Sequence, residues 1–275
     1  MANQVTKVVI AAPTFGSALQ ISMIESFKKL FKPEGMAMRS VTDDATTQKE
    51  RLKQALEQTK PNALIAISIR PDSDTIASYT AANVPIILID EEAIGVSTIT
   101  TDNNMGGRIA GEYLIKKKRK KIAIVTGRTN VKGGLNAEQR LEGFQQALRT
   151  HGLSIPIGCL MEVIHYSRED GIEVMPKLIA QGVDAIFCAA GDNCAQGLLS
   201  VARERGVRIP EDIAIVGFDD LLIAQLSTPA LTTIRQPLKE MAEAAYKMAV
   251  IHRVEILHKP QNEVFNPELV IRKSA

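Results

Sequence analysis

The sequence predicts an α/β protein made of two doubly wound parallel-sheet lobes. Short apolar runs rich in Val and Ile alternate with amphipathic stretches along the whole chain. Runs that are continuously apolar are typical of parallel strands covered by helices on both faces. There are more such runs than one typical sheet holds, and "KIAIVTG" at 121–127 is nearly repeated by "DIAIVGF" at 212–218. A chain of 275 residues is long enough for two such units.

Buried strands are predicted wherever such a run is bounded by polar residues, Gly or Pro. Eight segments fit this description: 7–13, 37–41, 63–68, 84–90, 121–127, 159–164, 183–190 and 213–218. The first four are assigned to one lobe and the last four to the other, with the division after "VSTITTDNN".

Packing helices are predicted between these strands from apolar residues that recur on one helical face. The clearest examples are 18–31, 137–152 and 238–253. Gly152 follows the second of these where a helix C-cap is expected. The last helix carries Leu238, Met241, Ala245 and Met248 on one stripe, which we expect to face a core.

Composition excludes several classes of protein. The 33 Lys and Arg residues nearly balance 31 Asp and Glu, so global charge favours neither nucleic acid nor a membrane surface. The three cysteines form no C-x-x-C pair, which argues against a disulfide framework or a zinc site. The apolar run at 8–12 is shorter than that of a signal peptide, and no run approaches the roughly 20 residues of a membrane span. A cytoplasmic location is expected.

Candidate site residues follow the predicted strands, because ligands of doubly wound sheets bind beyond the carboxyl ends of the strands. Carboxylates, a guanidinium, amides and aromatic faces together suit a small polyhydroxylated ligand. Asp90 or Asp192 alone could instead cap the next helix. Asp219 is expected to accept hydrogen bonds from ligand hydroxyls, and Asp220 to cap a helix or face solvent. The full set at the strand ends is Phe15, Ser68, Arg70, Asp90, Asn136, Arg140, Tyr166, Asp192 and Asp219.

Several segments resemble the effector-binding region of LacI/GalR-type bacterial transcription repressors. The most specific are "IPEDIAIVGFDD" and "PALTTIRQP", within 191–220 and 227–245. Further matches are "DNNMGGRIAGEYLIKKKRKKIAIVTG", "NAEQRLEGFQQAL" and the ending "NPELVIRKSA". The resemblance extends in order over essentially the whole chain.

The resemblance implies a type I periplasmic-binding-protein-like fold with a hinge of three crossovers. The expected lobes are 1–101 with 232–254 and 102–231 with 255–275, with a ligand cleft between them. It also implies a homodimer, a sugar or related polyol as effector, no cofactor, and operator DNA bound only through a headpiece that this chain lacks. Effector contacts are expected at Asp90, Asn136, Arg140, Asp192 and Asp219, with Tyr166 as a stacking aromatic and Gln236 beside a crossover.

Two features depart from this family, and two other functions remain open. The first strand is followed by no aromatic residue beyond Phe15, which argues against an ordinary hexose. The family's helix-turn-helix and hinge helix are missing, so we expect a fragment of a longer repressor. The alternative is a stand-alone or periplasmic sugar-binding protein for uptake or chemotaxis.

Catalysis and direct nucleic-acid binding are not expected. The sequence contains no G-x-S-x-G, P-loop, H-E-x-x-H or G-x-G-x-x-G motif. No catalytic residue and no metal are therefore predicted. The basic run "KKKRKK" at 116–121 lies where a helix should end and a strand begin. Lysines at that place complement the helix dipole and stay solvated, so this run is interpreted as a helix end.

Overall fold

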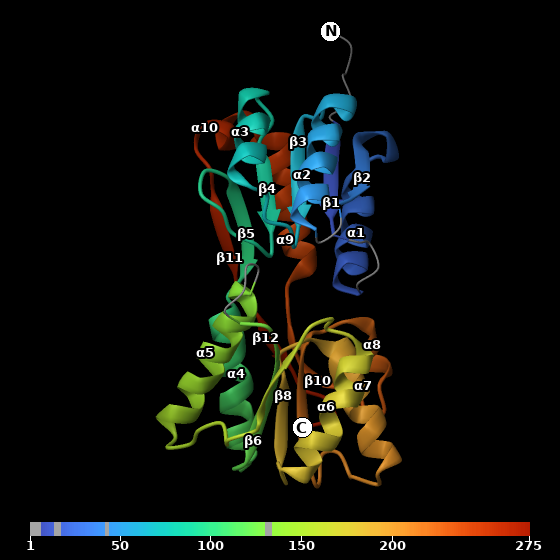
Figure 1. Ribbon diagram of the computed structural model, residues 1–275, viewed down its shortest axis with the longest axis vertical. Coiled ribbons are helices and arrows are strands. Elements are labelled where there is room, and N and C mark those ends of the chain that lie inside the picture. The colour runs from blue at the N-terminus through green and yellow to red at the C-terminus, as the bar shows by residue number, and fades with distance from the viewer. Residues whose placement is uncertain (1–6, 14–17, 42–43, 130–133) are drawn as a thin grey trace. The chain divides into compact units, whose positions relative to one another are not determined.

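A computed structural model describes residues 7–13, 18–41, 44–129 and 134–275, which form two compact units (Figure 1). Unit 1 comprises Met1–Thr101 and Pro237–Phe265, and unit 2 comprises Asp102–Gln236 and Asn266–Ala275. The chain therefore passes from one unit to the other three times.

The sheet of unit 1 has six strands in the order β11-β5-β4-β3-β1-β2, and every neighbouring pair is parallel. All residues of β1, β3 and β4 are buried, as expected of strands covered on both faces. The strands are β1 (Val8–Ala12), β2 (Met36–Ser40), β3 (Ala63–Ile67), β4 (Ile86–Ile89), β5 (Ser97–Thr101) and β11 (Asn262–Phe265).

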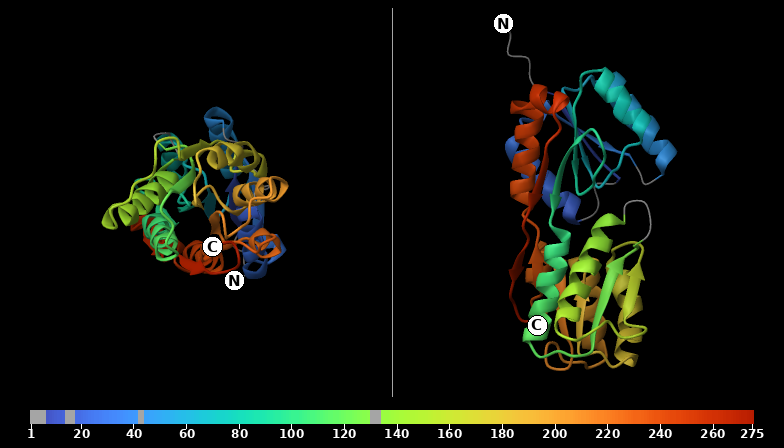
Figure 2. Two further views of the ribbon diagram at one scale, coloured as in Figure 1. Left: turned by 90° about the horizontal axis from the view of Figure 1, so that it is seen from below. Right: turned by 90° about the vertical axis from the view of Figure 1, so that its left-hand side faces the viewer.

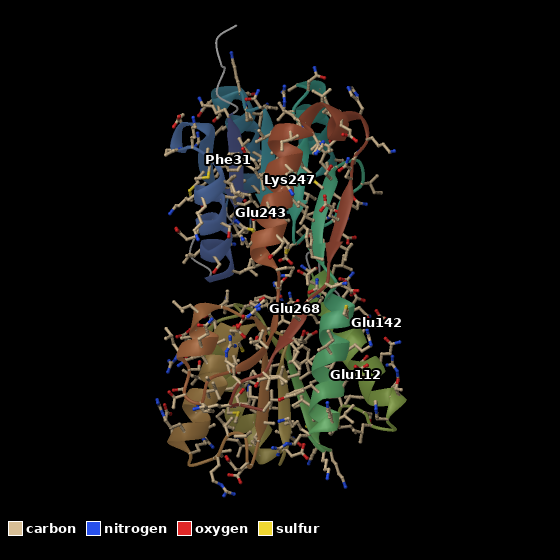
Figure 3. All side chains as sticks on the ribbon, turned by 180° about the vertical axis from the view of Figure 1, so that it is seen from behind. Phe31, Glu112, Glu142, Glu243, Lys247 and Glu268 are labelled. Carbon is tan, nitrogen blue, oxygen red and sulfur yellow. The ribbon has the colours of Figure 1, made fainter. Side chains whose placement is uncertain are left out.

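Helices cover both faces of this sheet (Figures 1 and 2). Alternate strand residues face α1 and α9 on one side and α2 and α3 on the other. Phe31, after the end of α1, lies against α9, with its ring centroid 4.8 Å from that of Tyr246 (Figure 3). The helices are α1 (Ala18–Leu30), α2 (Ala45–Gln54), α3 (Ser73–Ala81), α9 (Leu238–Tyr246) and α10 (Arg253–His258), with a 3-10 turn at Pro33–Gly35 and π turns at Ala55–Thr59 and Lys247–Ile251.

The sheet of unit 2 also has six strands, in the order β12-β10-β9-β8-β6-β7. Four of its pairs are parallel, and only β12 runs antiparallel to β10. The strands are β6 (Ile122–Gly127), β7 (Leu160–Val163), β8 (Ala185–Cys188), β9 (Ala214–Asp219), β10 (Thr232–Arg235) and β12 (Glu268–Val270). The predicted mostly parallel α/β architecture with two sheets is thus confirmed.

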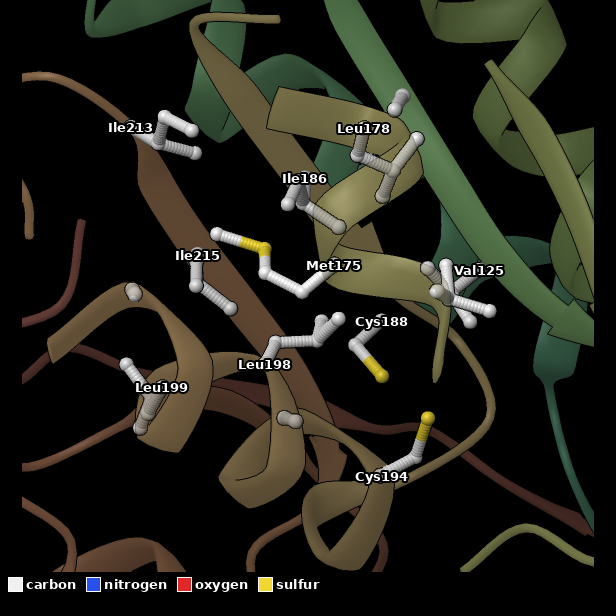
Figure 4. Packing of buried hydrophobic residues seen from close by; sticks show 14 of the residues in the cluster. Val125, Met175, Leu178, Ile186, Cys188, Cys194, Leu198, Leu199, Ile213 and Ile215 are labelled. Atoms are coloured by element: carbon white, nitrogen blue, oxygen red, sulfur yellow. The ribbon is translucent and has the colours of Figure 1, made fainter. Parts of the chain in front are cut away.

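Two apolar clusters form the interior of unit 2. One face of the sheet packs against α4 and α5, and the other packs against α6, α7 and α8. Cys188 and Cys194 lie in the second cluster beside Met175 and Leu198 (Figure 4), and all three cysteines are free and buried. The helices are α4 (Asn103–Lys116), α5 (Leu135–Thr150), α6 (Arg168–Ala180), α7 (Asp192–Glu204) and α8 (Leu222–Leu226).

Glycines bring α4 and α5 into direct backbone contact. A Cβ atom on Gly143 would overlap the backbone oxygen of Asn104, and one on Gly107 would overlap the backbone oxygen of Arg140. Only glycine permits so close an approach. This packing brings the beginning of α4 next to Arg140, which is one of the candidate site residues.

The last quarter of the chain is divided differently from the expected lobes. Thr232–Arg235 forms β10, which pairs with β9 of unit 2, so the chain returns to unit 1 only at Pro237. Asn262–Phe265 forms β11, which pairs with β5 of unit 1, so the final return to unit 2 comes at Asn266. Both segments are short strands whose partner could not be assigned from their own sequence.

Candidate functional site

Backbone strain is concentrated where strands end. Ser68 and Asp90 follow β3 and β4 with φ of 52° and 65°. In unit 2, Tyr166 follows β7 with φ 56°, and Asp219 and Asp220 at the end of β9 have φ of 107° and 59°. A non-glycine residue at positive φ costs about 1–3 kcal/mol, and such residues cluster at functional sites. The carboxyl ends of the strands are therefore the candidate site in each unit.

In unit 1, two of the predicted site residues are in contact. The Ser68 hydroxyl donates to Asp90 Oδ2 over 3.2 Å, and both residues are half-buried. Asp90 caps no helix, because the next element along the chain is β5. Arg70 is exposed two residues beyond Ser68. Phe15 lies outside the described residues.

In unit 2, a buried guanidinium is held from three directions. Arg140 on α5 is only 8% exposed, and its Cζ lies 3.7 Å from the centroid of the Phe218 ring. Its Nε donates to Asn103 Oδ1 over 2.7 Å, and its Nη1 donates to the backbone oxygen of Ala189 over 2.9 Å. Asn103 in turn donates from Nδ2 to Asn136 Oδ1 over 3.0 Å. A guanidinium has five N–H donors, and these contacts fix its plane with two of them.

Asp219 at the end of β9 is bonded to the segment that leaves the unit. Gln236 Nε2 donates to Asp219 Oδ1 over 2.6 Å, and the Gln236 backbone N–H is 3.4 Å from the Asp219 backbone oxygen. Gln236 is 3% exposed, whereas Asp219 is half-buried. Gln236 is thus positioned to orient the Asp219 carboxylate, and Asp219 retains some access to solvent.

Asp192 lies in the interior rather than at the surface of the site. It is completely buried; its Oδ2 accepts from the Leu221 backbone N–H over 2.8 Å, and its Oδ1 accepts from the Thr233 hydroxyl over 2.6 Å. Burial, and then the charge of Asp219, raise the pKa of the Asp192 carboxyl well above its usual range. It is the first residue of α7, whose N-cap is Gly191. Asp192 therefore joins α7 to β10 and to the turn before α8, and presents no oxygen to a ligand.

Asp220 corrects a second expectation. Its side chain is 5% exposed and accepts from Arg235 Nε over 2.7 Å and from Arg272 Nη2 over 2.5 Å. It neither caps α8, whose N-cap is Leu221, nor faces solvent. The Asp219 and Asp220 side chains point in different directions because the backbone has positive φ at both residues. Asp219 therefore bonds Gln236, whereas Asp220 bonds the two arginines.

Tyr166 lies against the end of β6. Its side chain is 43% exposed, and its hydroxyl occupies the space where a Cβ on Gly127 would be. A half-exposed aromatic ring at a strand end offers an apolar face to a ligand. Gly127 was not among the predicted site residues, although a glycine at the end of a predicted strand is a recognisable sign of close approach.

The basic run behaves as expected of a helix end. Helix α4 ends at Lys116 and β6 begins at Ile122. The backbone N–H groups of Lys120 and Lys121 donate to the Asp184 carboxylate over 2.8 and 3.0 Å, and both side chains are exposed. Among the described residues, no cluster of His, Cys, Asp and Glu could hold a metal ion. In the same part of the chain, no helix has the length and apolar character needed to cross a membrane.

The chain is similar in sequence to a known family of binding domains. Residues 112–275 match the model of the periplasmic binding protein-like domain. The chain belongs to that family. It is 29% identical over 279 aligned positions to the HTH-type transcriptional repressor PurR of Klebsiella pneumoniae, with 99% of this chain and 80% of the repressor covered. The chain therefore corresponds to the effector-binding region of LacI-type regulators, as the sequence resemblance predicted.

Solved structures of low identity share the fold of this periplasmic binding protein-like domain. A periplasmic binding protein/LacI transcriptional regulator from Alkaliphilus metalliredigens complexed with D-xylulofuranose has a TM-score of 0.83 at 23% identity, covering 98% of this chain and 99% of that one. A LacI family regulator from Enterococcus faecium with bound ribose has a TM-score of 0.83 at 22% identity, covering 98% of both chains.

Proposed function

We propose that this chain is the effector-binding and dimerisation domain of a LacI-type transcriptional repressor that acts in the cytoplasm. Its effector is a small polyhydroxylated molecule, a sugar or sugar derivative. The observation that carries this proposal is the set of strained and fixed polar side chains at the carboxyl ends of the strands, above all Arg140 and Asp219. Similar folds that hold D-xylulofuranose and ribose support it.

The chemistry of the contact residues favours binding of hydroxyl groups over turnover. Carboxylates such as Asp219 and Asp90 accept hydrogen bonds, while the fixed guanidinium of Arg140 donates them. Arg70, Ser68 and Asn136 add further polar groups, and Tyr166 offers a face for an apolar ring surface. We assign Asp192 to the interior and Gln236 to the orientation of Asp219. An effector of this kind alters DNA binding only if two conformations of the protein bind it unequally.

The proposal predicts that Asp219→Ala and Arg140→Ala each weaken effector binding about 10- to 150-fold, or about 1.5–3 kcal/mol, because each removes a charged hydrogen bond. D-ribose, D-xylulose, cellobiose, sugar phosphates and hypoxanthine would first be compared by thermal shift, since a ligand of the native state raises its apparent stability. Affinities of the best ligand would then be measured by calorimetry. Gln146→Ala, an exposed position on α5, is the matched control. Unchanged affinity in both site variants, or no ligand in the panel, would contradict the assignment.

Dimerisation is proposed through the face formed by α7 and α8. Leu222 and Leu226 project from α8 with 67% and 68% of their surface exposed. Beside them lies a groove whose lining includes Leu199, Ile223 and Arg203. We infer that the leucines of one copy enter the recess of a second copy related by twofold rotation, the symmetry by which most homodimers associate.

Charged substitutions on that face are expected to separate the dimer. Leu222→Asp and Leu226→Asp each place a carboxylate in the proposed interface, which should weaken association at least about 30-fold, or about 2 kcal/mol. Sedimentation equilibrium at micromolar protein would show a dimer for the unmodified chain and a monomer for the variants. Ile157→Asp, at a residue that is 99% exposed elsewhere in unit 2, should remain dimeric. A monomeric unmodified chain would disprove the dimer, and dimeric variants would disprove this face.

A further inference from the structure

Two of the three passages between the units are each bonded to one charged site residue through a buried side-chain amide. Asn103 is the second residue after the passage from Thr101 to Asp102, and Gln236 is the last residue before the passage to Pro237. They are 1% and 3% exposed. Asn103 accepts from Arg140, and Gln236 donates to Asp219. Each amide therefore joins one passage to a different charge of the site.

Both amides lie on backbone that is itself held firmly. Asp102 caps α4 by accepting from the Met105 backbone N–H over 2.8 Å, and this fixes the helix that begins at Asn103. Gln236 directly follows β10, where Arg235 is in register with Asp219 on β9. A displacement of the Arg140 or Asp219 side chain is therefore transmitted through the hydrogen-bonded amide directly to the backbone at a passage.

Burial raises the free-energy cost of breaking these hydrogen bonds. A buried polar group that loses its partner costs about 1–3 kcal/mol, and more where the partner is charged. Since water has little access to Asn103 or Gln236, an effector that draws Arg140 or Asp219 towards itself moves the amide with it. We therefore expect the hydrogen bond to persist and the passage to move with the charged side chain.

We propose that Asn103 and Gln236 are positioning residues that link effector contacts to the interdomain passages, Asn103 for Arg140 at the first and Gln236 for Asp219 at the second. This inference rests on the proposed function for the identity of the ligand, but the links themselves exist without ligand. They act in parallel: Asn103 joins the first passage to Arg140, and Gln236 joins the second passage to Asp219.

Hydrogen–deuterium exchange of the ligand-free chain tests the links directly. Arg140→Ala should raise exchange in residues 102–107 about tenfold, the equivalent of one charged hydrogen bond, and leave 236–241 unchanged. Asp219→Ala should give the opposite pattern. Gln146→Ala should change neither segment. The proposal would be overturned if either variant raised exchange equally in both segments, or if it raised exchange in neither. Circular dichroism would verify that the variants are folded.

Conversion of each amide to its acid gives a second readout that a purely structural role would not predict. Asn103→Asp keeps the acceptor and places a carboxylate against the Arg140 guanidinium, so exchange in 102–107 should stay within about twofold. Gln236→Glu removes the donor and opposes two carboxylates, so exchange in 236–241 should rise about tenfold or more. The same sign of change in both variants would contradict the assigned bond directions.

Ligand then separates this inference from the proposed function. With D-ribose as the probe, exchange should slow in both segments of the unmodified chain, but only in 236–241 of Asn103→Ala and only in 102–107 of Gln236→Ala. If D-ribose does not bind, D-ribose is not the effector, while the ligand-free patterns still decide the links. If it binds and both variants keep both effects, the links fail while the binding function stands.

Discussion

Replacing Gly143 by valine should destabilise unit 2 by about 3 kcal/mol or more. The Cβ atom of the new side chain would overlap the backbone oxygen of Asn104. Helix α4 cannot move away from α5 without disturbing its packing on the sheet, where Gly106 lies against the Phe218 ring. Overpacking against rigid backbone costs more than the 1–3 kcal/mol usual for flexible core neighbours. Because Arg140 lies on the same helix, effector affinity should fall together with stability.

The adjacent residue provides the control for this prediction. Glu142 is exposed on the same helix (Figure 3), so Glu142→Val introduces the same β-branched side chain with no overlap. Its expected cost is the helix-propensity difference alone, below about 0.7 kcal/mol. Denaturant unfolding measures both free energies. If the two valine variants differed by less than about 1 kcal/mol, the close approach of α4 and α5 would not be the stabilising contact inferred above.

Removal of the Asp192 carboxyl is expected to have the second largest effect. Asp192→Ala leaves the buried Leu221 N–H and Thr233 hydroxyl without their acceptor, and each such group costs about 1–3 kcal/mol. We expect the free energy of unfolding to fall by about 2–4 kcal/mol. The turn that carries Asp219 should loosen as well, because Leu221 lies two residues beyond it.

The pH dependence at Asp192 has a definite sign. Its folded-state pKa is raised by burial and by Asp219, above the value of about 3.9 expected in the unfolded chain. The associated stabilisation is therefore fully present below about pH 4 and is lost as pH rises through the folded-state pKa. Asp192→Asn retains an acceptor but cannot ionise, so its stability relative to the unmodified chain should improve as pH rises from 4 to 8.

Asp212→Asn is the matched control for the pH experiment. The pKa of the exposed Asp212 carboxyl is lowered to about 2, chiefly by its hydrogen bond with Arg208, so it is ionised throughout that range. Its substitution should change stability by the same amount at every pH from 5 to 8. A difference between Asp192→Asn and the unmodified chain that is equally flat would show that Asp192 does not bind an extra proton on folding.

Most of the strands that were predicted from sequence are continuous apolar runs, although β2 contains Arg39 and β7 contains Glu162. β1, β3, β4 and the central strands of unit 2 meet this description because helices bury both of their faces. β5, β10, β11 and β12 were not predicted. β5 reads "STITT", with Ser and Thr buried where apolar residues are expected, and β11 alternates exposed with half-buried residues at a sheet edge. Such strands lack the signal on which the prediction depends.

The site residues likewise divide into those that could be predicted from sequence and those that could not. Topology places the ends of parallel strands at one edge of each sheet, so Ser68, Asp90, Tyr166 and Asp219 could be selected from their position after a strand. Asn103 was not selected, because it follows a strand that was not predicted. Asp192 was selected, but its burial depends on its partners Leu221 and Thr233, which lie 29 and 41 residues further along the chain.

The amino-acid sequence by itself determined the α/β class, the two-sheet organisation, the positions of the central strands and the edge of each sheet where polar groups gather. These follow from hydrophobic periodicity, which is a local property of the chain. Tertiary structure alone decided which sheet receives β10 and β11, and that the Asp192 and Asp220 side chains are buried while Asp219 keeps access to solvent. It also decided that Asn103 bonds Arg140 and that Gln236 bonds Asp219. Those outcomes depend on contacts between residues far apart in the chain, where burial and the available hydrogen-bond partners choose among side chains of the same kind.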